Sequence, residues 1–279
     1  MIRKTPASSR ARAPKLLLGI AALAVIGLSA CGMTPPPAAT PVVVFDNSPA
    51  AVASSYQSLG YAATSTKELG DLVQLDGTAR KLTSAKLTLV TWAYQSAPIN
   101  SAWCTNHQLN CDALTGWDQP VKVTIYAAGG TNAAPTLGAV LGTATATVRV
   151  PWRPEPDPDC PENRWKDADG VCNNGLAFEA DVNFASSFTA PDEVIFGISY
   201  NTTNYGATPY GGPGGPYDSL NVALSDSDFV GNDKQPNIAF WNTSFPGFYT
   251  DGGAAGVGIF RADTGWAGQE PMIELYATT

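Results

Sequence analysis

The chain has 279 residues and a formal net charge of −8, with 24 acidic against 16 basic residues. This acidic balance excludes nucleic acid and anionic lipid headgroups as electrostatic partners, because both are bound by clustered lysine and arginine. Charged residues make up 14% of the chain, against about 25% in an average domain, and such a composition is typical of extracellular β-proteins.

The first 30 residues have the order of a secretion signal. Segment 1–15 carries five basic residues and no acid, an apolar stretch runs from Leu16 to Leu28, and small residues follow. A retained transmembrane helix would need about 20 consecutive apolar residues, which this stretch does not reach. The segment therefore predicts a signal peptide that is removed from the mature protein.

The signal ends in Leu28-Ser29-Ala30-Cys31, which resembles the lipobox at which bacterial lipoproteins are cleaved and acylated. The resemblance implies a diacylglycerol thioether on Cys31, and at least two acyl chains bind a membrane stably where one does not. Cleavage leaves 11 basic against 24 acidic residues, a net charge of −13. The expected location is therefore the cell envelope, facing the extracytoplasmic side.

Segment 31–41 joins this anchor to the folded part. It contains three consecutive prolines, which favour an extended polyproline conformation and predict a tether about 30 Å long. Gly32 stands where an aspartate would resemble an inner-membrane retention signal. The outer membrane is accordingly the expected destination if the host is Gram-negative.

Assigning Cys31 to lipid leaves four of the five cysteines, namely Cys104, Cys111, Cys160 and Cys172. An even number of cysteines in an oxidising compartment predicts disulfides, and four cysteines allow three pairings. We favour Cys104 with Cys111 and Cys160 with Cys172, because each pair brackets a short loop. A zinc site is the alternative, but the spacing lacks the close Cys-x-x-Cys pairs that zinc prefers.

Residues 42–279 are predicted to form one all-β domain, a jelly-roll-like β-sandwich with long disulfide-stapled loops. Short runs of alternating polarity recur between turn residues, and helical periodicity is almost absent. Alternation is clearest in 121–126 and in 176–184, where apolar residues share one face of the strand. The full predicted set is 42–45, 72–75, 86–92, 121–126, 143–150, 176–184, 194–200, 221–224, 238–241 and 272–277.

Three long, turn-rich segments separate the predicted strands: 96–120, 151–175 and 201–219. Loops of this length in a compact domain are usually functional or cross-linked. The first two contain the proposed disulfides. We find no internal repeat and no second domain.

The general plan resembles secreted and lipid-anchored bacterial β-sandwich proteins of unassigned function, over roughly residues 42–277. The resemblance rests on the segments 59–61 (LGY), 77–84 (GTARKLTS) and 216–221 (PYDSLN). Such sandwiches host carbohydrate binding, adhesion and occasional hydrolysis, so the resemblance in fold leaves the function open.

The sequence offers little for catalysis, and no catalytic residue is predicted. His107 is the only histidine, and no GxSxG string exists for a serine hydrolase; the nearest, 197–201, lacks the final glycine. Glu179 and Asp181 resemble the start of the ExDxxE motif of sandwich-fold glucanases, but Phe184 stands where the second glutamate belongs. We interpret the two acids as the solvated face of a strand.

Hard oxygen ligands cluster in segment 167–170 (Asp-Ala-Asp-Gly), which two asparagines follow shortly after. Such ligands suit a structural Ca²⁺ on Asp167 and Asp169, the only cofactor we consider, although the pattern is not an EF-hand. Asp-Gly is equally a common tight turn, which is the interpretation we favour. Asp226 and Asp228 are interpreted as solvated loop residues.

Aromatic residues concentrate in the long loops. Rigid rings on loops suit the binding of a glycan or a protein, because they bury area at a low cost in conformational entropy. Glycine-rich loops also use aromatics merely to hold themselves against the sandwich. The candidate ligand-binding rings are Tyr205, Tyr210, Tyr217, Trp103, Trp117 and Trp165.

The leading hypothesis is a lipid-anchored cell-surface protein without enzymatic activity, which binds a polysaccharide or a surface protein. One alternative is a carbohydrate-active hydrolase. The other is a structural envelope lipoprotein without a discrete ligand. No nucleic acid partner is expected.

Overall fold

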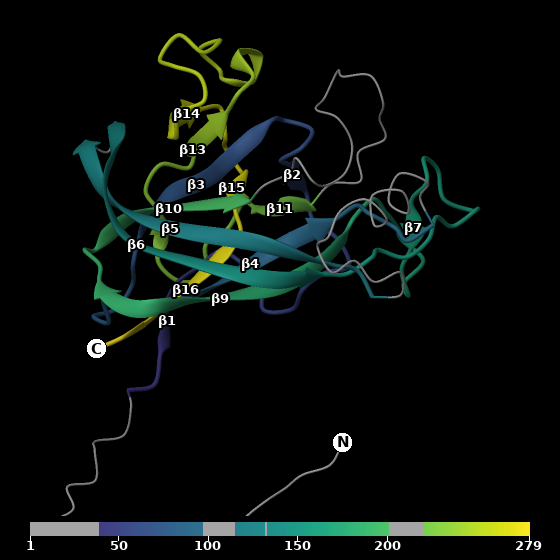
Figure 1. Ribbon diagram of the computed structural model, residues 1–279, viewed down its shortest axis with the longest axis horizontal. Coiled ribbons are helices and arrows are strands. Elements are labelled where there is room, and N and C mark those ends of the chain that lie inside the picture. Colours follow the sequence, from purple (N-terminus) through teal and green to yellow (C-terminus); the bar gives the residue numbers. More distant parts are fainter. Residues whose placement is uncertain (1–38, 97–114, 132, 201–219) are drawn as a thin grey trace, which may run out of the picture. The chain divides into compact units, whose positions relative to one another are not determined.

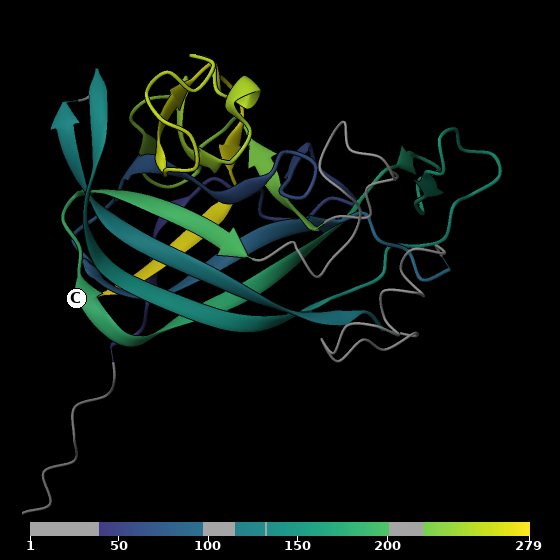
Figure 2. The same cartoon turned by 45° about the horizontal axis from the view of Figure 1, so that its top comes forward.

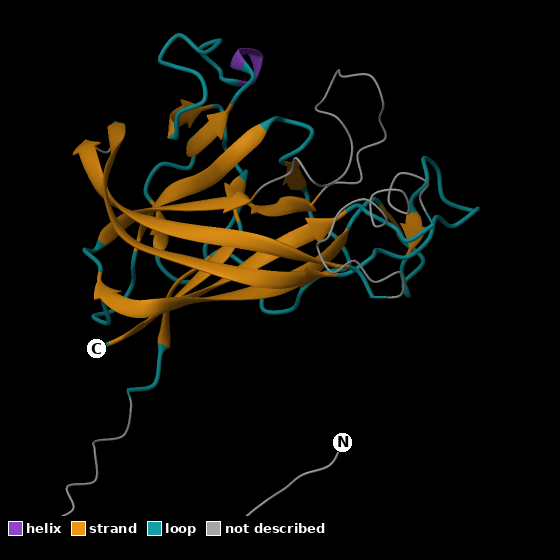
Figure 3. Cartoon of the chain, in the orientation of Figure 1, coloured by secondary structure: helices purple, strands orange, loops and turns teal. Residues whose placement is uncertain are grey.

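The computed structural model describes residues 39–96, 115–131, 133–200 and 220–279. Strands dominate these residues, and the one helix among them is the short 3-10 turn η1 (Pro246–Phe248) (Figure 3). Residues Ala39–Thr279 form one compact unit. Cys31, Cys104 and Cys111 lie outside the described residues, as do His107 and the loop 201–219.

The first of two main sheets has seven strands, and all of its pairs are antiparallel. β4 is the central strand: β9 pairs along one side of it, while β16 and β11 share the other side. β1 pairs with β16, and both β2 and β15 pair with β11. The strands are β1 (Val42–Asp46), β2 (Ser58–Gly60), β4 (Lys81–Thr91), β9 (Leu176–Thr189), β11 (Leu220–Ser225), β15 (Glu270–Pro271) and β16 (Ile273–Thr278).

The second sheet also has seven antiparallel strands, in the order β14-β13-β3-β10-β5-β6, with β12 pairing with β3 as well. A separate hairpin, β7–β8, lies in the loop between β6 and β9. The remaining strands are β3 (Thr66–Gln74), β5 (Trp117–Thr131), β6 (Ala134–Val150), β7 (Trp165–Lys166), β8 (Cys172–Asn173), β10 (Glu193–Tyr200), β12 (Asn232–Asp233), β13 (Ile238–Thr243) and β14 (Arg261–Thr264).

The two sheets pack face to face around one apolar core (Figures 1 and 2). Alternate residues of the long strands point into it, as the period of two along a strand requires. In β9, by contrast, Glu179 and Asp181 lie on the opposite, exposed face, as predicted. The inward residues of four strands are Ala85, Leu87 and Leu89, Val121, Val123 and Ile125, Val194, Phe196 and Ile198, and Ile273, Leu275 and Ala277.

At one edge the sandwich is joined by contacts between β6 of the second sheet and β9 of the first. Gly142 of β6 permits this approach: a Cβ atom there would lie 2.1 Å from the Phe188 ring of β9. The Phe188 ring also meets the Phe184 ring edge-on, with centroids 5.1 Å apart. A glycine therefore gives the aromatic ring room to close the core at this edge.

The chain enters the first sheet through an edge strand. β1 pairs with β16, so that Val42 lies opposite Ala277. Directly after β1, the buried Asn47 accepts a hydrogen bond from the backbone N–H of Ile273 (2.8 Å) and donates one to the carbonyl of Pro271 (3.1 Å). These bonds fasten the first strand of the unit to its last one.

The predicted all-β sandwich is confirmed, and each of the ten predicted strands falls on a strand. The structure adds six short strands, β2, β7, β8, β12, β14 and β15, and it begins β6 at Ala134 rather than at residue 143. The predicted loop 96–120 ends earlier, because β5 starts at Trp117, and the loop 151–175 contains the β7–β8 hairpin.

Truncating a central core side chain should destabilise the protein markedly. Leu87 of β4 is fully buried between the sheets, so we expect Leu87→Ala to lower the free energy of unfolding by about 2–5 kcal/mol. Urea denaturation followed by tryptophan fluorescence measures the change.

Leu137→Ala is the matched control, because this leucine of β6 is 37% exposed. Its substitution should change the free energy of unfolding by about 0.5 kcal/mol or less. Equal losses for the two variants would contradict the position of the core.

Candidate functional site

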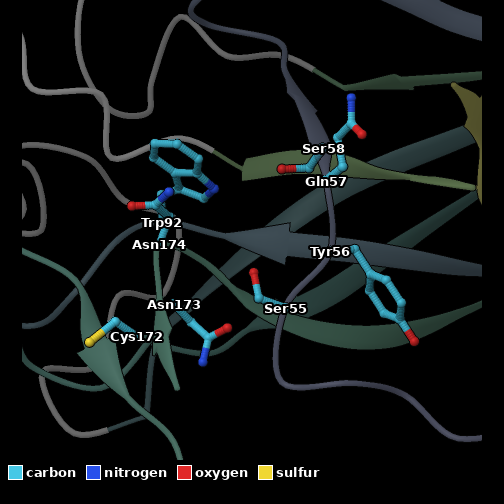
Figure 4. Close-up of a pocket in the computed structure, with 8 residues that line it drawn as sticks. All are labelled: Ser55, Tyr56, Gln57, Ser58, Trp92, Cys172, Asn173 and Asn174. Atoms are coloured by element: carbon cyan, nitrogen blue, oxygen red, sulfur yellow. The ribbon is translucent and has the colours of Figure 1, made fainter. Parts of the chain in front are cut away.

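A pocket of about 450 Å³ lies on the outer side of the first sheet (Figure 4). It is lined by residues 55–58, by Trp92 directly after β4, and by residues 172–174 at β8. Its lining combines two aromatic rings with hydroxyl and amide groups. The lining residues are Ser55, Tyr56, Gln57, Ser58, Trp92, Cys172, Asn173 and Asn174. None of these eight residues carries a carboxylate or an imidazole.

The two rings have an apolar base on the sheet. Tyr56 and Trp92 are half-buried and pack against Val90, Ala223 and Met272, which form a small cluster on this face. The hydroxyl of Tyr56 also donates to the carbonyl of Ala51 at 3.3 Å, at the start of the same segment. Rings held in this way offer a flat apolar surface without losing further conformational entropy.

Gly175 lets the backbone pass closely beside the indole of Trp92. A Cβ atom at this position would lie 2.2 Å from Val90 Cγ1 and 2.7 Å from Trp92 Cδ1. Any larger residue would therefore displace the ring that forms one side of the pocket.

The opposite wall is held by a cross-link and by a carboxylate. Cys160 and Cys172 form a disulfide, as predicted, and Cys172 itself lines the pocket. Asp167 accepts hydrogen bonds from the backbone N–H of Val171 (2.8 Å) and from the side-chain amide of Asn173 (2.9 Å). Both contacts hold the hairpin that presents Asn173 to the pocket.

The interpretation of segment 167–170 as a turn agrees with this geometry. Both oxygens of Asp167 accept hydrogen bonds within the loop, including one from the backbone N–H of Asp169 (3.1 Å). The bond from Val171 is the main cause that lowers the pKa of Asp167 from its usual value. The carboxylate thus acts as a turn cap next to the pocket.

The structure corrects the prediction for two of the candidate ligand-binding rings, because both are buried. Trp117 is fully buried and its ring lies 4.9 Å from that of Trp152. Trp165 is 6% exposed and its indole N–H donates to the carbonyl of Gly175 at 2.9 Å. Both rings fasten loops to the sandwich instead of facing a ligand. Tyr205, Tyr210, Tyr217 and Trp103 lie outside the described residues.

A second polar site, which the sequence did not predict, lies between the two sheets. Asp71 of β3, Asp233 of β12 and Glu270 of β15 are 1%, 6% and 7% exposed. One carboxyl oxygen of each lies within 4.8 Å of the others. We call these three residues the acidic cluster.

Burial is the main cause that raises the pKa of all three acids. At Glu270, a hydrogen bond with the Asp233 side chain and the charges of Asp233 and Asp228 add to this effect, and its pKa rises to about 9. The pKa of Asp71 is raised well above its usual value, with the charges of Asp233 and Glu270 as further causes. The cluster therefore resists carrying three negative charges without compensation.

Asp263 shows how this fold satisfies a buried carboxylate elsewhere. It is 3% exposed and accepts hydrogen bonds from Thr250, through both the backbone N–H (3.1 Å) and the hydroxyl (2.9 Å). Its second oxygen accepts the indole N–H of Trp266 at 3.1 Å. In the acidic cluster, by contrast, one buried oxygen of each acid lacks such a donor.

Comparison with protein-family models, with curated proteins and with solved structures finds no match for this chain. Within the described part of the chain, no helix is long and apolar enough to span a membrane. Function must therefore be inferred from the pocket, from the acidic cluster and from the sequence.

Removing the disulfide beside the pocket should destabilise the protein. In the chain-entropy model, closing a loop of this length contributes about 3 kcal/mol, so the double variant Cys160→Ser with Cys172→Ser should lose up to about that much free energy of unfolding. Urea denaturation measures the loss. An unchanged midpoint would show that the cross-link does not constrain the unfolded chain.

Proposed function

We propose that this protein is a lipid-anchored, non-enzymatic binder of neutral glycans at the cell envelope, with the pocket around Tyr56 and Trp92 as its site. The observation that supports the proposal is one exposed pocket in which the indole of Trp92 lies among amides and hydroxyls, with Tyr56 packed on the sheet at its border. No catalytic group is needed for this role.

Sugars present apolar C–H faces together with hydroxyl groups that both donate and accept hydrogen bonds. A half-buried indole can pack against such a face. The amides of Gln57 and Asn174 each offer a donor and an acceptor to hydroxyl groups. The amide N–H groups of Asn173 bind Asp167 and Val171, so this residue offers its oxygen. Figure 4 shows the oxygen of Asn173 pointing towards Ser55 across the pocket.

Two further features favour a neutral glycan and binding over hydrolysis. The chain is acidic, with a net charge of −8, so its field repels polyanionic glycans. Glycoside hydrolysis needs two carboxyl groups flanking the scissile bond, and the pocket lining has none. Glu179 and Asp181, the only acids that resemble a glucanase motif, stand on the exposed face of β9.

The anchor in this proposal comes from the sequence. Leu28-Ser29-Ala30-Cys31 and the proline-rich segment 31–41 would place the folded unit a short distance from the membrane. A glycan of the envelope or of a neighbouring cell would then be within reach of the pocket.

Removing the indole should weaken glycan binding. We expect native electrophoresis in gels containing laminarin, xylan or galactomannan to retard the wild-type protein in at least one case. Trp92→Ala should then raise the Kd about 10-fold or more, because aromatic anchors dominate such sites. Circular dichroism checks that the variant is folded.

Phe245→Ala serves as the control, because Phe245 is 52% exposed and does not line the pocket. Its retardation should equal that of the wild type. Equal retardation of Trp92→Ala would disprove the site, and release of reducing sugar would contradict a purely binding role.

Lipidation can be tested separately. With Cys31→Ser, the thioether cannot form, so we expect the protein to move from the detergent phase to the aqueous phase of a Triton X-114 partition and to lose labelling by an alkyne-bearing fatty acid. A Ser29→Ala variant should keep both properties. Retained labelling of Cys31→Ser would refute the anchor.

A further inference from the structure

We propose that Asp71, Asp233 and Glu270 form a binding site for one divalent cation between the two sheets, and that Ca²⁺ is the ion that fits it. The site is separate from the glycan pocket and does not rest on the proposed function. It also differs from the loop position at Asp167 and Asp169 that the sequence suggested.

The spacing of the oxygens matches one shared ion. Ca²⁺ binds oxygen at about 2.3–2.6 Å, so two ligands on opposite sides of it lie roughly 5 Å apart. In the acidic cluster, one oxygen from each of the three carboxyls lies within 4.8 Å of the other two. All three can therefore reach a common centre.

Each of the three carboxyls has one oxygen to which no N–H group or alcohol of the described residues donates a hydrogen bond. These oxygens, Oδ2 of Asp71, Oδ2 of Asp233 and Oε2 of Glu270, are all buried. The other oxygen of each aspartate is used by the backbone: Asp71 accepts from Leu72 (2.7 Å) and Asp233 from Gln235 (2.6 Å). Buried carboxyl oxygens without donors are costly unless a cation neutralises them.

No basic side chain supplies that neutralisation. The ion pairs formed by the described residues include none with the three acids of the cluster. Lys234, the direct neighbour of Asp233 in sequence, instead contacts Gln74 (3.1 Å) and Glu193 (3.6 Å). The cluster can therefore be neutralised only by protons shared among the carboxyls or by a bound cation, and we infer the cation.

The donor set selects among cations. It consists of carboxylate oxygens without nitrogen or sulfur, which suits Ca²⁺ or Mg²⁺ and does not suit zinc. Mg²⁺ demands short bonds of about 2.0–2.1 Å in a near-ideal octahedron and keeps several waters. Ca²⁺ accepts an irregular set of carboxylate oxygens at about 2.3–2.6 Å, which suits three carboxyls held by separate strands.

Rigid elements hold the ligands in place. Asp71 occupies an inward position of β3, between the core residues Leu69 and Val73, while Asp233 lies opposite Val73 through the β12–β3 pair. Glu270 comes from β15 in the other sheet. Asp228 fixes the backbone of Asp233 by accepting its N–H at 2.6 Å, and its Oδ1 is a fourth unpartnered oxygen.

Thermal unfolding of the purified protein tests the proposal. After treatment with EDTA and dialysis, CaCl₂ at about 100-fold above its Kd should raise the thermal midpoint by about 5–10 °C. Elemental analysis should find one additional calcium per chain, and MgCl₂ should give a smaller shift at equal concentration.

Two isosteric variants assign the ion to the cluster. Glu270→Gln and Asp233→Asn should abolish the calcium-dependent shift and the bound calcium. Both should still fold without the ion, because each removes a charge that the cluster cannot neutralise. Glu179→Gln, which changes an exposed acid, should keep the full shift.

Two results would overturn the proposal. If Asp169→Asn abolishes the shift while Glu270→Gln retains it, calcium binds the loop at 167–170 instead. If neither calcium nor magnesium moves the midpoint of the wild type and no calcium is bound, the carboxyls share protons and the cluster is not a metal site.

Discussion

The two sheets of this protein each have an apolar face, and those faces leave water only when they are stacked on each other. Side chains alternate between the two faces of a strand, and Leu87, Val123 and Phe196 are buried because they lie on the face that meets the other sheet. Polar side chains consequently lie mainly on the outer faces and at the ends of the strands, with the acidic cluster as an exception. The pocket follows from this arrangement, because Tyr56 and Trp92 pack on the outer side of the first sheet, away from the main core.

Features outside the core need their own means of support. In segment 154–174, which carries Asn173, Trp165 is the one buried residue. The disulfide and the Asp167 turn supplement the few apolar contacts of this segment. Asp71, by contrast, is an acidic residue inside the core: it points inward from β3, on the same face as the apolar side chains of Leu69 and Val73. A carboxylate in that position reduces the stability of the core unless a counter-charge accompanies it, which gives the acidic cluster its interest.

The sequence predicted the long strands well, because four or more residues of alternation, as in 121–126, suffice to define a face. Strands of two or three residues such as β2, β12 and β15 contain no such period and were missed.

The disulfide between Cys160 and Cys172 was predictable from the short loop. The burial of Trp117 and Trp165 was not, because a ring on a loop has the same sequence signal whether it faces solvent or the core. The acidic cluster was also missed: Asp71 is separated from Asp233 and Glu270 by well over a hundred residues, and the three meet only once both sheets are stacked. A carboxylate inside the apolar run Leu69-Gly70-Asp71-Leu72-Val73 was the one available signal.

The pairing of β1 with β16 has a mechanical consequence. Any force that acts on the chain from its N-terminal side pulls on an edge strand of five residues, so tension enters the fold at one edge of the first sheet. Asn47 follows that strand directly, and its side chain is hydrogen-bonded to the backbone on both sides of Met272, at Pro271 and Ile273. Its side chain therefore acts as a stop that limits how far a pulling force can peel the first strand before the load reaches the core.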